Sequence, residues 1–271
     1  MAFTQVRPPP PLRDSIETIW DWHVAPGEWR LDRILPTPGA ALVINLHEDE
    51  TRVYADDGAR ACERTEGFAI NGQTTRSFII DTAEQIAVMG VIFKPGAAAR
   101  FLREPLDRLA DRHVAFSDLA GDGVRALRER LVNTGTAALR IALVERWLCA
   151  RFDADALHPA VAFALRSLAR APQAARVDRL VVESGLSARR FGDLFRTQVG
   201  IGAKRYARLL RFRGVVAQVQ RGIAVDWAHV ALDCGFHDQP HLVREFRAFA
   251  GMTPSAYAAA SGPDVNHIAL P

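Results

Sequence analysis

Two segments in the last third of the chain repeat each other at a spacing of 51 residues. The matched pairs at this spacing are Ser187 and Asp238, Phe191 and Leu242, Phe195 and Phe246, Arg196 and Arg247, Gly200 and Gly251, and Tyr206 and Tyr257. So many matches at one offset are hard to obtain by chance. Two copies are too few for a solenoid, so the repeat predicts a pair of similar subdomains.

Each copy has the pattern of two short helices joined by a tight turn. In the first copy, Gly185 suits the turn, and Ser187 is expected to cap a second helix with an apolar face. In the second copy, Gly235 and Asp238 take these places, and Pro240 falls in the first helical turn, where proline is tolerated. The pattern predicts two helix-turn-helix units. The proline-free stretch between them is expected to form one connecting helix.

The charge is divided unevenly along the chain. The formal net charge is +3, from 34 Arg and Lys against 31 Asp and Glu. Residues 173–260 hold 13 of the basic and seven of the acidic side chains, a balance of +6, which leaves −3 for the rest. This asymmetry favours a polyanionic partner for the C-terminal end, although a solvated helical surface often has the same composition.

Exposed side chains near the start of the second helix of each unit are the candidates for reading DNA. They face the major groove in such units, where Gln pairs with adenine and Arg pairs with guanine in bidentate geometry. For a single side chain the alternative is an ordinary solvated helix residue, and two similar polar faces weaken that alternative. The candidates are Arg189 and Arg190 in the first unit and Gln239, His241 and Arg244 in the second.

The stretch "GFHDQPHLVREFRAFAGMTP", from Gly235 to Pro254, resembles the signature of the AraC/XylS-type DNA-binding domain of bacterial transcription regulators. The resemblance extends from Val177 to Tyr257. It implies two helix-turn-helix units, held by a central helix, that read adjacent major-groove segments of double-stranded DNA. By position it implicates Arg189, Gly192 and Asp193 in the first recognition helix, and Gln239, Pro240, His241 and Arg244 in the second.

The first recognition helix departs from that pattern. Gly192 has no side chain, and the carboxylate of Asp193 would repel phosphate. The first unit is therefore expected to add little base specificity, so that sequence preference rests on the second. The side chains expected to hold the DNA backbone are Arg189, Arg190, Arg196 and Arg208.

The N-terminal half predicts a different fold. From about Leu31 to Phe93, short β-branched or aromatic runs such as "ALVINL" and "IAVMGVIF" alternate with turn sequences such as "HEDE" and "NGQ". They predict a small antiparallel β-domain, a barrel or a sandwich, after an extended proline-rich lead-in. The stretch "KPGAAARFLREPLDRLADR" is expected to return the chain to helix. Amphipathic helices should follow at about 122–132, 136–152 and 158–170.

These features predict an α+β protein in three parts. They are a β-rich sensory domain at 1–120, a helical connector at 121–172 and the AraC-type DNA-binding domain at 173–262, with the last boundary in "ARAPQAA". The stretches "RILPTPGAALVINL" and "GVIFKPGAAARFLREPLDRLADRHVAFSDLAG" resemble the β-rich sensory half of a subgroup of these regulators, which implies signal reception.

A ligand pocket in the β-domain is one hypothesis for that sensory role. Tryptophans in a small β-domain are more often plain core residues, so the ligand-binding residues and the effector stay unassigned. The side chains that could line a pocket are Trp20, Trp22, Trp29, Phe68 and Phe78, with Arg33 and Arg76 as polar anchors.

The alternative function is a cupin-like enzyme domain fused to a DNA-binding module. Residues 1–120 contain neither H-x-H nor G-x-S-x-G, so no catalytic residue is predicted. His47 with Glu48 and Glu50 is a weak metal candidate, because neighbours on a strand point to opposite faces and no second His is close in sequence. Neither a metal nor another cofactor is expected.

The remaining features concern location and partners. The three cysteines are far apart in the sequence, which favours buried reduced thiols. No uncharged stretch approaches the roughly 18 residues that cross a bilayer, and no signal-peptide pattern opens the chain. A cytoplasmic protein with no membrane partner is expected. Its expected partners are double-stranded DNA, a small-molecule effector and, through the amphipathic middle helices, a second copy in a homodimer.

Overall fold

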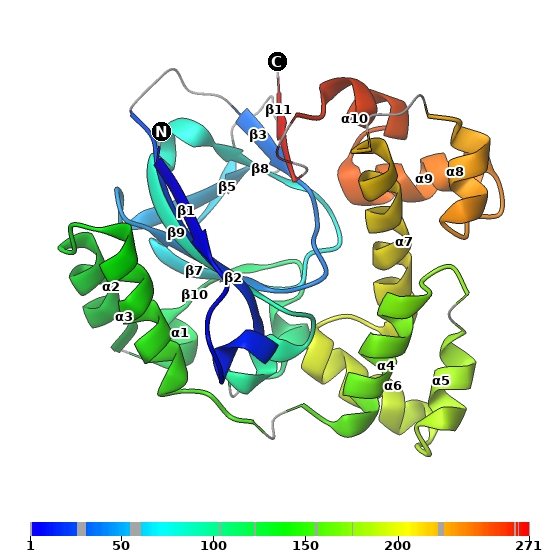
Figure 1. Cartoon of the computed structure of the whole chain (residues 1–271), viewed down its shortest axis with the longest axis horizontal. Coiled ribbons are helices and arrows are strands. Elements are labelled where there is room, and N and C mark those ends of the chain that lie inside the picture. The colour runs from blue at the N-terminus through cyan, green and yellow to red at the C-terminus, as the bar shows by residue number, and fades with distance from the viewer. Residues whose placement is uncertain are drawn as a thin grey trace.

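The computed structural model shows a two-sheet β-domain beside a helical domain (Figure 1). The expected α+β class is confirmed. The structure describes residues 2–25, 31–54, 61–102, 104–121, 123–154, 157–174, 176–221, 225–262, 264 and 266–270. No helix in these ranges is long and apolar enough to cross a membrane.

Within the described ranges the β-domain has two antiparallel sheets, one of six strands and one of five. The six-stranded sheet has the order β1 (Ala2–Val6), β2 (Ile16–His23), β9 (Ala87–Phe93), β4 (Ala41–Asn45), β7 (Phe68–Asn71) and β10 (His113–Ala115). The five-stranded sheet has the order β11 (His267–Ala269), β3 (Leu31–Ile34), β8 (Phe78–Asp81), β5 (Glu50–Tyr54) and β6 (Cys62–Glu66). The predicted antiparallel β-domain is therefore confirmed.

Most helices lie in the second half of the chain. The α-helices are α1 (Ser117–Ala120), α2 (Gly123–Val132), α3 (Ala137–Cys149), α4 (Pro159–Arg170), α5 (Val177–Glu183), α6 (Ala188–Val199), α7 (Ala203–Val219), α8 (Trp227–Asp233), α9 (Gln239–Ala250) and α10 (Pro254–Ala260). Short 3-10 helices cover Leu12–Asp14, Thr82–Glu84, Ala97–Arg100 and Leu106–Leu109. The three middle helices expected from periodicity correspond to α2, α3 and α4.

The sheet begins earlier than the sequence analysis expected. The first strand signal was placed at about Leu31, but β1 and β2 precede it and form one edge of the six-stranded sheet. The β2 sequence hides its alternation because both of its faces are covered. Ile19 packs into the apolar cluster under α2 and α3, whereas Trp20 lies over Gly90 of β9 on the opposite face.

The stretch after β9 is not the helix that was expected. It forms only the 3-10 turns at Ala97–Arg100 and Leu106–Leu109, and the chain then pairs with β7 as β10. The first turn ends at Phe101, and Pro105 in the middle of the stretch disfavours helical backbone at Glu104 and lacks the N–H that a continuous helix would need. The apolar spacing that suggested a helix instead points Phe101, Leu106 and Leu109 into the core.

The outer face of the six-stranded sheet packs against α2 and α3 (Figure 1). Alternate residues of each strand supply this face, as the two-residue period of a strand requires. The buried side chains of the layer include Leu42, Ile44, Ile70, Met89 and Val91 from the sheet and Leu127, Leu131, Ile141, Val144 and Leu148 from the helices. Most of the expected connector is therefore part of the β-domain.

A buried ion pair ties α3 to the sheet. Arg140 of α3 is 7% exposed and Asp21 of β2 is 2% exposed. Arg140 donates from Nε and Nη2 to the two carboxylate oxygens of Asp21, at 2.6 and 2.9 Å. Its Nη1 donates to the carbonyl of Thr134 at 2.6 Å, and Nη2 also lies 2.8 Å from Nε2 of His23.

The remaining middle helix belongs to the helical domain. Val161, Ala164 and Leu168 of α4 are fully buried in the same apolar cluster as the repeat helices. The backbone N–H of His158, at the start of α4, donates to the side-chain oxygen of Gln198 in α6 at 3.0 Å. The expected boundary at 169–175 thus lies between two helices of one core.

The helical domain is built around α7, the connecting helix that the sequence predicts. Phe212 of α7 is fully buried between Phe246 and Phe249 of α9, with ring centroids 4.9 and 5.2 Å away. Tyr206 of α7 packs edge-on against Phe195 of α6 at 5.9 Å. One rigid helix therefore contacts the apolar face of both second helices of the repeat.

Candidate nucleic-acid interface

The two repeats fold into two helix-turn-helix units, α5 with α6 and α8 with α9. Gly185 and Gly235 make the turns at φ 68° and 78°, a left-handed backbone that other residues adopt at a cost. Phe191 and Phe195 of α6 are fully buried, as are Leu242 and Phe246 of α9. The apolar faces expected from the sequence are confirmed, so the polar faces of α6 and α9 remain outside.

Both recognition helices start at the predicted caps. Ser187 accepts a hydrogen bond on Oγ from the backbone N–H of Arg190 at 3.3 Å, and Asp238 accepts one on Oδ1 from that of His241 at 2.7 Å. This backbone bond, followed by the contact with the His237 ring, lowers the pKa of Asp238. Satisfied first-turn N–H groups fix where each helix begins and hence where its first side chains point.

The candidates at the start of α6 are open to solvent. Arg189 and Arg190 are both exposed. Asp193, one turn further, is half-exposed and accepts a hydrogen bond from Nη2 of Arg196 at 2.6 Å. That arginine, expected to hold DNA backbone, therefore already has a carboxylate partner on its own helix.

The candidates on α9 differ in how far their environment fixes them. Gln239 and Arg244 are exposed, whereas His241 is half-buried with its ring edge-on to Phe236 at 5.5 Å. Nδ1 of His241 accepts from the backbone N–H of His237 at 3.3 Å. The ring proton then resides on Nε2, where His241 can donate to an acceptor on DNA.

The repeat offset places opposite charges at one matched position. Asp193 of α6 corresponds to Arg244 of α9, and Arg196 corresponds to Arg247. Arg244 and Arg247 are exposed, and neither has an ion pair within the described residues. At these two matched positions α6 thus carries a neutralising ion pair, whereas α9 carries two positive charges.

Arg208 has a different environment from the one expected. It donates from Nε and Nη2 to both oxygens of Glu245, at 2.6 and 2.8 Å, and this bidentate pair links α7 to α9. The hydrogen bonds to Glu245 raise the pKa of Arg208. A DNA phosphate would have to displace Glu245 to reach these two donors, and the expected contact of Arg208 with DNA backbone stays a prediction.

The pocket residues suggested in the β-domain do not lie together. Phe68 is on the outer sheet face, stacked on Phe116 at 5.1 Å and facing Trp147, so its assignment to a pocket is wrong. Trp29 lies outside the described residues. Arg76 is exposed, and Arg33 lies at the contact with the helical domain. The anchors proposed from the sequence therefore do not converge.

Two of the remaining candidates for a ligand pocket lie on the inner face of the six-stranded sheet. Trp20 and Trp22 lie on it, half-buried, on the side of β2 away from the helices. At the other edge, the imidazole of His113 meets Phe78 of the second sheet edge-on at 4.6 Å. His113 Nδ1 lies 2.7 Å from Oδ1 of Asn71, an acceptor to which it donates. Aromatic and polar groups thus face each other between the sheets.

Lowering the pH below neutrality should reduce the free energy of unfolding through His113. Burial, opposed by the charge of Asp111, lowers the pKa of His113 to about 4 from an ordinary 6.5. Between these values the unfolded chain binds the extra proton, so stability is complete above pH 6.5 and falls with pH by at most about 1.4 kcal/mol per unit. Urea unfolding at pH 7 and pH 5 should show a smaller decrease for His113→Gln than for the wild type. Equal decreases in the free energy of unfolding for the variant and the wild type would contradict the assignment of this pH dependence to His113.

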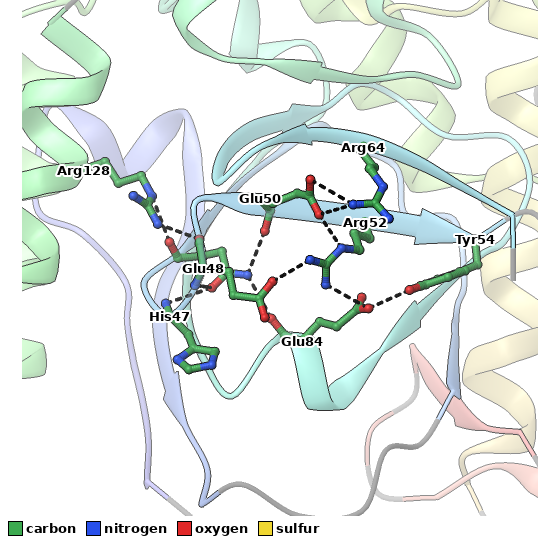
Figure 2. A network of polar contacts seen from close by, with 9 residues as sticks. His47, Glu48, Glu50, Arg52, Tyr54, Arg64, Glu84 and Arg128 are labelled. Atoms are coloured by element: carbon green, nitrogen blue, oxygen red, sulfur yellow. Dashed lines mark hydrogen bonds and ion pairs between the residues drawn. The ribbon is translucent and has the colours of Figure 1, made fainter.

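The weak metal candidate forms a different structure. Arg52 of β5 sits among the carboxylates of Glu48, Glu50 and Glu84, which bind its guanidinium (Figure 2). Burial alone would lower the pKa of Arg52, but the hydrogen bonds with Glu50 and Glu84 raise it. Tyr54 donates to Glu84 at 2.7 Å, and Arg64 pairs with Glu50 at 3.0 Å.

The imidazole of His47 lies outside this network (Figure 2). Arg128 of α2 reaches the same loop and donates to the backbone carbonyls of Asn45 and Glu48 at 3.0 and 2.6 Å. The described residues contain no group of three His, Cys, Asp or Glu side chains placed to hold a metal ion. Glu48 and Glu50 of the acidic run therefore take part in ion pairs with Arg52, and the pair of Arg52 with Glu84 joins β5 to the 3-10 turn at Thr82–Glu84.

Family comparison gives the helical domain its identity. The profile of a family described as a helix-turn-helix domain matches residues 180–260, which include both recognition helices. Residues 180–260 form an AraC-type helix-turn-helix domain. Residues 4–115 match a family described as a domain of unknown function (DUF6597), which spans most of the β-domain. No curated protein matches the chain.

Solved structures similar to this chain include DNA-bound and ligand-bound proteins. The DNA-binding domain of AdpA, a global transcriptional factor in complex with a target DNA, is 26% identical over 38% of this chain and 93% of its own, with a TM-score of 0.33. ToxT from Vibrio cholerae is 9% identical over 96% of this chain and 98% of its own, with a TM-score of 0.46. ToxT with a bound unsaturated fatty acid is 10% identical over 89% and 93%, with a TM-score of 0.44.

The sequence reasoning missed the residues that join the two domains. Arg33 and Ser77 of the β-domain contact the C-terminal end of α9, and Arg205 of α7 hydrogen bonds to Thr75. Within the sequence, Arg33 and Arg205 are indistinguishable from other scattered arginines. The only available signal was Gly251, whose match to Gly200 in the repeat marked a special backbone position.

Proposed function

We propose that this chain is a sequence-specific DNA-binding transcription regulator whose β-domain receives the controlling signal. The observation that carries the proposal is the pair of AraC-type helix-turn-helix units with polar, solvent-exposed starts of both recognition helices. Such a unit places the start of its second helix in the major groove. A regulator of this kind acts where bacterial DNA is, in the cytoplasm.

In this proposal the second unit reads the sequence and the first mainly holds the DNA. Gln239, His241 and Arg244 offer donors and an amide to base edges, and the acidic group beside them, Asp238, caps the helix by accepting from the backbone N–H of His241. In α6 the exposed guanidinium groups of Arg189 and Arg190 suit phosphate contacts, which are independent of sequence.

The proposed role of the β-domain is reception rather than chemistry. Its carboxylates Glu48, Glu50 and Glu84 are bound to Arg52, and its buried Asp21 is bound to Arg140. Acidic groups held in this way support structure. The half-buried aromatic side chains between the sheets suit an apolar small molecule better than a polar reaction centre. The helical contacts of this domain provide a route from such a ligand to the DNA reader.

DNA binding by the full chain should depend steeply on salt. Each phosphate contact releases counterions, so the logarithm of the binding constant should fall linearly with the logarithm of salt concentration, with a slope of about −0.9 per contact. Replacing Arg189 and Arg190 together by alanine should make the slope shallower by about two and weaken all DNA sequences alike. Gel-shift titrations at several salt concentrations measure both quantities.

The control for this experiment is a second pair of arginines far from the recognition helices, Arg125 and Arg130 of α2. Alanine at both positions removes the same charge from the chain and should leave the salt slope unchanged. DNA binding that does not depend on the salt concentration, or equal binding to DNA and to polyglutamate as a competing polyanion, would contradict the proposed function.

A further inference from the structure

The β-domain touches the two repeats at the same place. Gly200 and Gly251 are the matched residues that end α6 and α9, and both have left-handed backbone, with φ 97° and 72°. A Cβ on Gly200 would lie 3.1 Å from Cβ of Gln73, and one on Gly251 would lie 2.7 Å from Nη1 of Arg33. Each recognition helix therefore ends directly against the β-domain, at the end opposite its proposed DNA-reading residues.

At the second unit this contact is polar and partly buried. The backbone N–H of Ser77 donates to the carbonyl of Phe249, in the last turn of α9, at 2.7 Å. Arg33 donates from Nη1 to Oγ of Ser77 at 3.3 Å and lies beside Gly251. Its Nε is buried with no hydrogen-bond partner among the described residues. A guanidinium at this position faces the negative end of the α9 dipole.

At the first unit the contact is made by the turns that follow β9. The end of α6 packs against the 3-10 turns at Ala97–Arg100 and Leu106–Leu109. Beside it, Arg205 in the first turn of α7 hydrogen bonds to Oγ1 of Thr75 and lies 3.8 Å from the carboxylate of Asp111. The loop 73–77 of the β-domain thus reaches both repeats.

The C-terminal tail adds a third connection. After α10 the chain returns to the β-domain and forms β11, which pairs antiparallel with β3 (Figure 1). Ile268 of β11 is Arg33's partner in the register, and it is fully buried in the apolar cluster of the helical domain. The strand that carries Arg33 is therefore held on one side by the tail of the very domain that Arg33 contacts.

We infer that the β-domain fixes the separation and tilt of the two recognition helices, with Arg33 and β11 as the positioning elements of the second unit. The inference rests on the proposed DNA-binding function. α9 has 12 residues, so its start lies about 18 Å from Gly251. A tilt of about 10° around that end moves Gln239, at the start of α9, by about 3 Å, which is close to one base-pair rise, and moves Arg244 by about 2 Å. Release of Arg33 or β11 should then make less definite the spacing between the site that the second unit reads and the phosphates that the first unit holds.

The test uses the full chain and duplexes that carry the preferred site of the second unit, which comes from a randomised-site selection with the wild type. In each duplex, one phosphate on the side of the first unit is replaced by an uncharged methylphosphonate, at a different spacing from that site. For the wild type the loss of affinity should be concentrated at one spacing, roughly tenfold or more above its neighbours. Arg33→Ala and Ile268→Asp should each reduce this spacing preference to about threefold or less, while the base preferences within the site stay the same.

Two matched variants serve as controls. Arg33→Lys keeps a cation at the end of α9 and should retain most of the spacing preference. Ala256→Asp introduces the same acid as Ile268→Asp at an exposed position in the first turn of α10, outside β11, and should behave as the wild type. If Ile268→Asp proves unfolded by its melting temperature, Arg33→Ala decides the outcome alone. A spacing preference unchanged in Arg33→Ala would overturn the inference, whereas a wild type that selects no DNA sequence would overturn the proposed function instead.

Discussion

Replacing Asp21 by alanine should lower the free energy of unfolding by about 3–5 kcal/mol. The guanidinium of Arg140 would stay buried between α3 and the sheet, with the Thr134 carbonyl and Nε2 of His23 as its remaining partners among the described residues. A buried charge without a counter-charge is far more costly than an exposed one. Urea unfolding at pH 7 measures the change directly from the midpoint and slope.

Two variants separate the buried charge from ordinary ion pairing. Asp21→Leu combined with Arg140→Met removes both charges and should recover most of the lost stability, because apolar groups replace the pair without leaving a charge behind. Glu104→Ala breaks the exposed pair with Arg108 and should cost less than about 1 kcal/mol. If Asp21→Ala cost no more than Glu104→Ala, the pair would not be the structural link described here.

Local chemistry made the recognition helices readable from sequence. Ser187 and Asp238 satisfy backbone groups within three residues of themselves, and Gly185 and Gly235 adopt a backbone that few other residues can. Such features need no knowledge of the rest of the fold. The caps, turns and apolar faces of α6 and α9 could therefore be predicted with the residues at which these helices begin, and so could the single helix between the repeats.

Features that depend on distant partners could not be predicted in this way. The strand β2 has both faces covered, so its alternation is hidden, and β11 exists only because the edge of β3 is available to it. Arg208 has the sequence context of a phosphate-binding side chain, but its partner Glu245 lies on another helix. Phe68 and Phe78 have similar settings in the sequence, yet Phe68 faces the helices outside the six-stranded sheet, whereas Phe78 faces His113 between the two sheets.

The same limit applies to the candidate interface. Sequence alone placed Arg189, Arg190, Gln239, His241 and Arg244 on the outside of the recognition helices, where the structure also has them. Their contacts with bases or phosphates stay predictions. The sequence could not show that Asp193 neutralises Arg196, because an i, i+3 pair on an exposed face forms only if the rotamers of both side chains allow it. That pair now distinguishes the two repeats.

Arg244→Asp should weaken binding to the preferred DNA site by more than the about 1–3 kcal/mol that loss of one bidentate base contact costs. The substitution gives α9 the acid that α6 carries at the matched position. The new carboxylate would lie one turn from Arg247, in the i, i+3 relation of Asp193 to Arg196, and would occupy that arginine as well. Arg244→Ala, which lacks the acid, should lose only the base contact.

The reciprocal change in α6 should act in the opposite direction. Asp193→Ala frees Arg196 and removes a carboxylate that faces the DNA, so affinity for all sequences should rise and the salt slope should steepen by about one contact. Competition gel shifts with the preferred site and a scrambled duplex separate the two effects. Arg244→Ala should reduce the ratio of the affinity for the preferred site to the affinity for the scrambled duplex. Asp193→Ala should leave this ratio unchanged and raise both affinities. If Asp193→Ala weakened binding to the preferred site alone, Asp193 would itself be a base reader, accepting from a cytosine amino group, and the first unit would share in specificity.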